Sequence, residues 1–108
     1  MDLEIIKTNK PLEKPDFLNK PIQFGVHHTD HLLEIDYFAN TWQGPKISKY
    51  HSLSIDPFNS TLHYAIQLFE GMKAFKTEDG KVTLFRPEMN MKRMNSSAER
   101  LSLPVNYL

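Results

Sequence analysis

The sequence lacks cysteine altogether, carries no excess of charge and contains no long hydrophobic run. Because no cysteine is present, disulfide frameworks, cysteine-ligated zinc, iron–sulfur clusters and thiol nucleophiles are excluded. The 108 residues hold 13 Lys and Arg against 13 Asp and Glu, so the formal net charge is zero with neutral histidines. Nucleic-acid binders normally carry a basic excess, and binders of anionic lipid need clustered Lys and Arg. We therefore expect neither nucleic acid nor a membrane as a partner.

Glycine is also scarce, and the N-terminal residues do not have the composition of a targeting peptide. The four glycines are too scattered for a phosphate-cradling loop, and no spacing typical of a serine nucleophile occurs. The N-terminal residues include Asp2 and Glu4, and the first arginine is Arg86, unlike a signal peptide or an arginine-rich presequence. The sequence therefore predicts a cytoplasmic protein, while a mitochondrial location stays open if a presequence is missing.

What the chain does contain is typical of a small globular protein: 40% hydrophobic and 24% charged residues. Residues 1–22 carry Pro11, Pro15 and Pro21, which predict an extended N-terminal arm. Residues 23–108 are predicted to form an incomplete small α/β domain. The apolar run that begins after Pro104 stops at once at Leu108, which indicates a truncated domain.

Hydrophobic periodicity predicts strands in the first half of this domain. Near-alternation over residues 31–39 predicts a strand whose inner face holds Leu33, Ile35 and Tyr37. Residues 47–55 form a weaker strand candidate, which ends at the turn signal at 56–57. We expect a loop over residues 56–61.

Helical spacing and a turn signal describe the second half. A short helix is predicted at 62–69, capped by Ser60 or Thr61. Strand-like runs flank Asp79-Gly80, a strong hairpin signal. From about Pro87 to Leu101 the spacing predicts an amphipathic helix whose apolar face includes Met91, Met94, Ala98 and Leu101. Clustered strands covered by one C-terminal helix indicate an α+β fold.

Three groups of residues suggest chemistry, and each has a plainer interpretation. The HHTDH run at 27–31 could ligate zinc, but in a strand at most two or three ligands converge, so we expect no metal site. Lys73 could be desolvated enough for a Schiff base, but its alternation favours an edge lysine on the wetter face. Arg93 and Arg100 lie on nearly one line of the C-terminal helix and could hold a phosphate. The residues alone favour a solvated helix face there.

Three segments read together closely resemble the N-terminal part of branched-chain amino acid aminotransferases. They are FGVHHTDHLLEIDY, LHYAIQLFEGMKAFK and VTLFRPEMNMKRMNSSAERLSLP, which extend from about Phe24 to Pro104. The resemblance implies a fold-type-IV pyridoxal 5′-phosphate enzyme, of which this chain is most of the smaller N-terminal domain. Such an enzyme transfers the amino group of leucine, isoleucine or valine to 2-oxoglutarate and forms a homodimer.

The resemblance assigns roles to four residues. Arg93, in NMKRM, matches the position that binds the cofactor's phosphate. Phe24 and Phe69 match residues that line the apolar substrate pocket, and Tyr64 matches a pocket tyrosine that serves the partner subunit's active site. An aromatic pocket can bury a branched side chain but discriminates single methylenes only modestly.

The resemblance also implies that the chain holds no catalytic residue. The Schiff-base lysine of the family lies beyond Leu108, and Lys73 does not match its position, so the chain alone is not expected to complete a turnover. Two alternatives stay open at this point. One is a non-catalytic truncated product that dimerises with an intact subunit; the other is a fold-type-IV relative acting on D-amino acids or aminodeoxychorismate.

Overall fold

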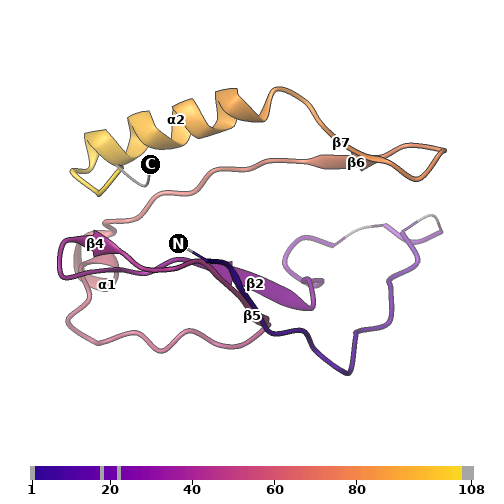
Figure 1. Ribbon diagram of the computed structural model, residues 1–108, viewed down its shortest axis with the longest axis horizontal. Helices are drawn as coiled ribbons and strands as arrows, with labels where there is room; N and C mark the ends of the chain where they lie inside the picture. Colours follow the sequence, from indigo (N-terminus) through magenta and orange to yellow (C-terminus); the bar gives the residue numbers. More distant parts are fainter. Residues whose placement is uncertain (1, 18, 22, 106–108) are drawn as a thin grey trace. The chain divides into compact units, whose positions relative to one another are not determined.

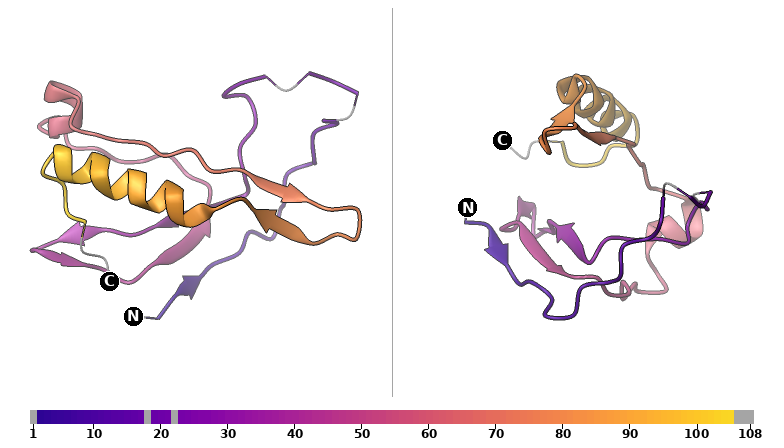
Figure 2. Two further views of the ribbon diagram at one scale, coloured as in Figure 1. Left: turned by 90° about the horizontal axis from the view of Figure 1, so that it is seen from above. Right: turned by 90° about the vertical axis from the view of Figure 1, so that its right-hand side faces the viewer.

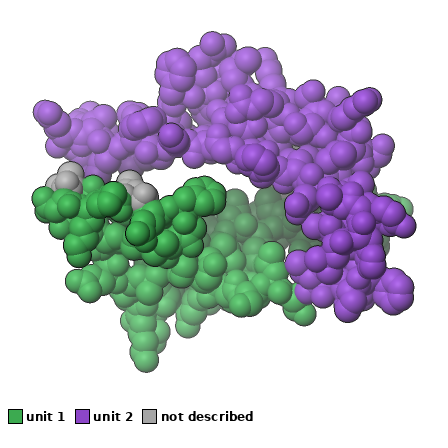
Figure 3. All heavy atoms as spheres, turned by 180° about the vertical axis from the view of Figure 1, so that it is seen from behind, with its two compact units in different colours: residues 1–54 green, residues 55–108 purple. Residues whose placement is uncertain are grey.

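The computed structural model describes residues 2–17, 19–21 and 23–105, and it confirms the α+β class (Figure 1). Most of the apolar run after Pro104 lies outside the described residues. Contacts gather into two compact units, residues 1–54 and 55–108 (Figure 3). The boundary predicted between an arm at 1–22 and a domain at 23–108 stays a prediction. Each unit is described by itself.

The first unit is organised by a three-stranded sheet with the order β1-β5-β2. Its central strand β5 (Lys46–Lys49) pairs antiparallel with β2 (His31–Glu34), with His31 opposite Lys49 and Glu34 opposite Lys46. On its other side β5 pairs in parallel with β1 (Glu4–Ile5), so part of the proline-rich N-terminal segment forms a strand. The sheet thereby joins segments that lie about forty residues apart in the sequence.

The strand predicted at 31–39 is divided in two, and the prediction of which face points inwards is wrong. Continuing the register of β2 would place Ile35 opposite Pro45, which has no N–H for the ladder, so the pairing ends at Glu34. The chain resumes as a hairpin of β3 (Tyr37–Phe38) and β4 (Thr41–Trp42). Leu33 is 62% exposed, whereas Leu32 and Glu34 are half-buried, so the opposite face is the more protected one.

The tight turn of this hairpin consists of Ala39 and Asn40, which have φ angles of 49° and 59°. Two successive positive φ values match the right-handed twist of the flanking strands in a two-residue loop. The rings of Tyr37 and Trp42 meet across the hairpin at 5.0 Å in an edge-on arrangement. This short ladder was not predicted from the sequence, because its turn lacks glycine.

The second unit begins with a helix that is shorter than predicted and shifted towards the N-terminus. Helix α1 (Ser60–Tyr64) is capped by Asn59, whose Oδ1 accepts a hydrogen bond from the Thr61 amide at 2.8 Å. It ends after Tyr64 because Ala65 adopts the left-handed conformation at φ 53°. The predicted caps, Ser60 and Thr61, are therefore already inside the helix.

The hairpin predicted around Asp79-Gly80 is confirmed. Strands β6 (Ala74–Lys76) and β7 (Val82–Leu84) pair antiparallel, with Phe75 opposite Thr83. Gly80 has a φ of +82°, a conformation that costs little only for glycine.

The predicted C-terminal helix is confirmed as α2 (Pro87–Arg100), with Pro87 in its first turn. In Figures 1 and 2 it runs alongside the extended segment that leads into β6. Of its predicted apolar face only Ala98 is buried among the described residues, while Met91 and Met94 remain 44% and 41% exposed. The apolar face of α2 is therefore only partly buried within the described chain.

Large apolar side chains are exposed in both units. Phe24, Phe58 and Phe69 are at least 92% exposed. Helices among the described residues are too short and too polar to cross a membrane.

Candidate functional site

The strongest polar cluster of the second unit lies where α2 runs beside the segment that precedes β6. Arg93, in the second turn of α2, donates from Nε to Oε2 of Glu70 at 2.7 Å. Its Nη2 donates to Oε1 of the same carboxylate, so the two groups form a bidentate ion pair. The Glu70 side chain is only 8% exposed, whereas that of Arg93 is 64% exposed. The pair therefore has a protected acidic side and an open basic side.

Asn90 fixes the same carboxylate from one helical turn earlier. Its Nδ2 donates to Glu70 Oε1 at 2.9 Å and to the Gly71 carbonyl oxygen at 2.9 Å. Residues three apart share a face of a helix, which is why Asn90 and Arg93 reach the same carboxylate. The first turns of α2 are thus joined to residues 70–71 by four side-chain hydrogen bonds.

These contacts keep the Glu70 carboxyl ionised. Hydrogen bonds from Arg93 and then from Asn90 lower the pKa of Glu70 to about 2, and partial burial opposes them. The same contact raises the pKa of Arg93. At neutral pH the cluster is a fully charged pair.

The guanidinium of Arg93 has donors to spare. Of its five N–H groups, Glu70 accepts from the one on Nε and from Nη2. Within the described part of the chain, both N–H groups of Nη1 and the second one of Nη2 have no protein acceptor. A planar, exposed set of three donors suits a phosphate oxygen group. This donor set fits the phosphate that the family resemblance assigns to Arg93.

The three predicted pocket aromatics are open to solvent within their own units. Tyr64 ends α1 and is 79% exposed, and Phe69 directly precedes Glu70 and is 93% exposed. Phe24 belongs to the first unit and is fully exposed. None of the three is enclosed by its own unit, so their role as a substrate pocket stays a prediction.

The HHTDH run ties down the N-terminal segment. Asp30 Oδ1 accepts from the Leu12 amide at 2.8 Å, and His31 Nε2 accepts from the Thr8 amide at 2.9 Å. The ring of His28 stacks on Tyr50 at 3.7 Å with an interplanar angle of 10°. No group of three or more histidine and carboxylate side chains able to hold a metal occurs among the described residues.

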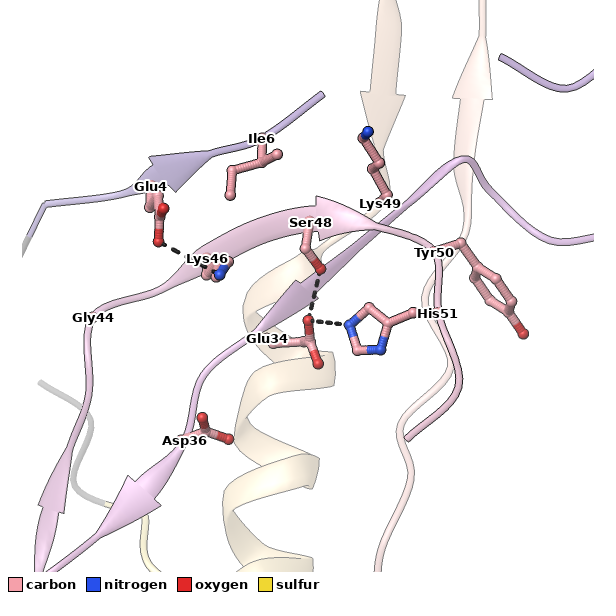
Figure 4. A pocket seen from close by; sticks show the side chains of 10 residues that line it. All are labelled: Glu4, Ile6, Glu34, Asp36, Gly44, Lys46, Ser48, Lys49, Tyr50 and His51. Atoms are coloured by element: carbon pink, nitrogen blue, oxygen red, sulfur yellow. Dashed lines mark hydrogen bonds and ion pairs between the residues drawn. The ribbon is translucent and has the colours of Figure 1, made fainter. Parts of the chain in front are cut away.

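An open hollow of about 660 Å³ lies on the first unit, over the β1-β5-β2 sheet. At its centre Glu34 Oε2 accepts from Ser48 Oγ at 2.7 Å and pairs with His51 Nε2 at 2.9 Å (Figure 4). Hydrogen bonds from Ser48 and His51 lower the pKa of Glu34, and hydrogen bonds to Ser52 and Glu34 raise that of His51. Serine and histidine both bind the carboxylate rather than each other, so this is no nucleophilic triad. The lining residues are Glu4, Ile6, Glu34, Asp36, Gly44, Lys46, Ser48, Lys49, Tyr50 and His51.

Arg93 was predicted from the sequence, whereas Glu70 and Asn90 were not. The usable signal was the spacing of Asn90 and Arg93, which places two donors on one helical face. The acceptor is 23 residues from Arg93 in the sequence, and no local pattern indicates such a contact. Lys73 is exposed, as its predicted place on the wetter face implies.

Comparisons with known proteins decide the family. The chain is 49% identical over 101 residues to the cytosolic branched-chain-amino-acid aminotransferase of Saccharomyces cerevisiae. It is 47% identical over 104 residues to the mitochondrial enzyme of Bos taurus, and 44% over 103 to branched-chain-amino-acid transaminase 1 of Bacillus subtilis. These alignments cover 93%, 95% and 94% of the chain. This chain is homologous to part of the branched-chain-amino-acid aminotransferases.

The similarity to branched-chain aminotransferases confirms the predicted resemblance and defines its extent. The chain spans 27%, 26% and 28% of the length of these three relatives, about a quarter of each. Such coverage agrees with the prediction that it matches an N-terminal portion of the family. No protein-family model matches the chain. Relatives with both cytosolic and mitochondrial names occur, so the cytoplasmic location stays a prediction.

Proposed function

We propose that this chain supplies the phosphate-binding arginine and part of the substrate pocket of a pyridoxal 5′-phosphate-dependent branched-chain aminotransferase. The complete enzyme transfers the amino group of leucine, isoleucine or valine to 2-oxoglutarate, has fold type IV and works as a homodimer. The observation that carries the proposal is Arg93. In a chain homologous to these enzymes, it is held by Glu70 with three N–H donors left open.

Arg93 binds the cofactor's phosphate in this proposal. The phosphate of pyridoxal phosphate is a dianion near neutral pH, and a guanidinium holds it through charge-assisted hydrogen bonds. When bound, the cofactor acts as an electron sink that makes amino-group transfer possible. Arg93 contributes the anchoring and orientation of that group, at the end remote from the reacting carbon.

The aromatic residues contribute specificity. Phe24 and Phe69 line the apolar pocket for the branched side chain, and Tyr64 reaches the active site of the partner subunit. Their exposure supports this role, because side chains that are 79% or more exposed in the isolated chain are free to be covered by other parts of a dimer. Burial of a branched aliphatic group against such rings is favourable in proportion to the apolar area removed from water.

The chain is not sufficient for turnover. The Schiff-base lysine of the family has no match among its residues, and about three quarters of the length of the relatives lies outside the match. The names of these relatives favour branched-chain amino acids over D-amino acids or aminodeoxychorismate as substrates. The pairing of a non-catalytic chain with an intact subunit is tested separately, by mixing the two chains.

The test is a chimeric subunit in which this chain replaces the matching segment of the Saccharomyces cerevisiae enzyme. We expect the chimera to retain pyridoxal phosphate and to transaminate leucine but not D-alanine. Arg93→Ala should weaken cofactor affinity by about tenfold or more, because charge-assisted hydrogen bonds are lost. Arg100→Ala, in the last turn of the same helix, is the matched control.

Two results would count against the proposal. Unchanged cofactor affinity in the Arg93→Ala chimera would remove the role of that residue. A folded, dimeric chimera that prefers D-alanine would replace the substrate class. Mixing the 108-residue chain with the intact yeast subunit and finding a stable, less active heterodimer would favour the non-catalytic alternative.

A further inference from the structure

The Glu70 carboxylate has no role in the proposed function, yet side-chain donors of α2 hold both of its oxygens. Three donor contacts from α2 converge on its two oxygens: two from Arg93 and one from Asn90. Its side chain is 8% exposed, although it lies between Phe69, which is almost fully exposed, and Gly71. The protected carboxylate therefore has Arg93 and Asn90 as its side-chain partners.

Arg93 gains a fixed orientation from this contact. A free arginine side chain has many rotamers, and ordering it on a ligand costs conformational entropy. The bidentate contact through Nε and Nη2 fixes both the direction of the side chain and the plane of the guanidinium. The edge that carries Nη1 is then presented ready for a ligand.

Asn90 keeps the carboxylate itself in place. Its Nδ2 bridges Glu70 Oε1 and the Gly71 carbonyl oxygen, both at 2.9 Å. The bridge ties the backbone at residue 71 to α2, so the acid cannot turn away without breaking an amide contact as well. Glu70 is thus anchored through its own side chain and through the backbone of the next residue, Gly71.

We propose that Glu70 is a positioning residue, which together with Asn90 orients the Arg93 guanidinium towards the phosphate of pyridoxal phosphate. This inference rests on the proposed function, since it takes Arg93 as the phosphate ligand. Glu70 preorganises the site. Because Arg93 is already ordered when the protein folds, less conformational entropy is lost when the phosphate binds.

A purely competitive role for Glu70 predicts the opposite effect on cofactor affinity. If Glu70 merely occupied Arg93 in place of a phosphate, its negative charge would repel the incoming anion and its removal would strengthen binding. Positioning predicts that removal weakens binding. Cofactor affinity in Glu70 variants therefore separates the two.

The experiment uses the chimeric subunit and compares pyridoxal 5′-phosphate with pyridoxal, which lacks the phosphate. We expect Glu70→Ala to raise the dissociation constant for pyridoxal phosphate about tenfold, the scale on which partners that orient ligand-binding groups act. The constant for pyridoxal should change much less, because the effect is specific to the phosphate. A general loss of structure would weaken both ligands alike. Glu99→Ala, which removes an exposed acid from the same helix, is the control.

Glu70→Gln is the conservative variant. It keeps the shape and one acceptor oxygen, and we expect it to recover much of the affinity that Glu70→Ala loses. It also secures the test if the alanine variant fails to fold. The ¹⁵N resonance of Arg93 Nε should lose its hydrogen-bonded shift in Glu70→Ala and keep part of it in Glu70→Gln.

The outcomes separate this inference from the function beneath it. If Arg93→Ala leaves the preference for pyridoxal phosphate over pyridoxal unchanged, the phosphate role of Arg93 fails. If Arg93→Ala reduces that preference while both Glu70 variants keep or increase it, only the positioning role of Glu70 is overturned.

Discussion

The imidazole Nε2 of His51 lies 2.9 Å from Oε2 of Glu34, and the same oxygen accepts the hydroxyl of Ser48. The two titrating partners shift in opposite directions: the pKa of Glu34 is lowered and that of His51 is raised. This pair ties the end of β2 to the segment that follows β5.

The pair should stabilise the first unit most strongly between about pH 4.5 and 6.5, the ordinary pKa values of its members. The stabilisation that Glu34 contributes is present above pH 4.5 and is lost as the pH falls through the lowered pKa of this residue. The stabilisation that His51 contributes is present below pH 6.5 and is lost as the pH rises through the raised pKa. Thermal unfolding of the chain and of His51→Ala across pH 3 to 9 measures the difference. Ser48→Ala, the control, keeps the His51–Glu34 pair, so it should retain the loss of stability on the alkaline side; a His51 effect independent of pH would contradict the prediction.

Glu70 should titrate only in strong acid. Its pKa of about 2, against an ordinary 4.5, follows from the hydrogen bonds of Arg93 and Asn90. The ¹³C carboxyl resonance of Glu70 should therefore show no protonation above about pH 3. In Arg93→Ala the midpoint should rise towards 4.5. A Glu70 midpoint near 4.5 in the unaltered chain would mean that the pair does not form in solution.

Asp30 and His31 should control the order of the N-terminal segment. Removing both acceptors with Asp30→Ala and His31→Ala leaves the amides of Leu12 and Thr8 without their side-chain partners. Hydrogen exchange at these two amides should accelerate, and proteolytic cleavage should increase between residues 8 and 20. Asp36→Ala, an exposed acid of the same unit, should leave both unchanged. Equal protection in the double variant would show that β1 alone holds the segment.

Gly80 should be sensitive to any side chain. Its φ of +82° costs a non-glycine residue about 1 to 2 kcal/mol, so Gly80→Ala should depopulate the β6–β7 hairpin. Cross-strand nuclear Overhauser effects between Phe75 and Thr83, which are paired in the ladder, report the population. Gly44→Ala is the control, since its added Cβ would meet only ordinary van der Waals contact at 3.5 Å.

The isolated chain should bind hydrophobic dyes and self-associate. Phe24, Phe58 and Phe69 are almost fully exposed, and Ala98 is the one buried apolar side chain among the described residues. Exposed apolar surface of this extent normally marks an interface. Fluorescence of anilinonaphthalene sulfonate should be several-fold higher with the 108-residue chain than with the chimeric subunit at equal molarity. Equal, low fluorescence would show that the chain covers this surface by itself.

Local signals predicted the elements that local interactions determine. The β6–β7 hairpin follows from Asp79-Gly80, and α2 follows from Pro87 and the spacing of its apolar residues. Helix α1 was predicted too far along the chain, because the left-handed turn at Ala65 carries no glycine or proline to announce it.

Features that depend on residues distant in the sequence could not be predicted from local sequence signals. The end of β2 at Glu34 is set by Pro45, which directly precedes the neighbouring strand β5, and the protected face of β2 is set by its pairing with β5. The resemblance identified Arg93, but the acid that holds it lies 23 residues away in an extended segment. Contacts of this range follow from the tertiary arrangement.

The neutralisation of Arg93 by Glu70 also sets the range over which the site attracts its ligand. The electrostatic field of a lone exposed guanidinium extends over roughly 10 Å at an ionic strength of 0.1 M, whereas the opposite fields of the two charges in an ion pair largely cancel at that distance. Attraction of an anion by the Glu70–Arg93 pair is accordingly a contact effect. Association of pyridoxal phosphate should therefore depend little on added sodium chloride, and its rate should reflect collision and fit rather than steering.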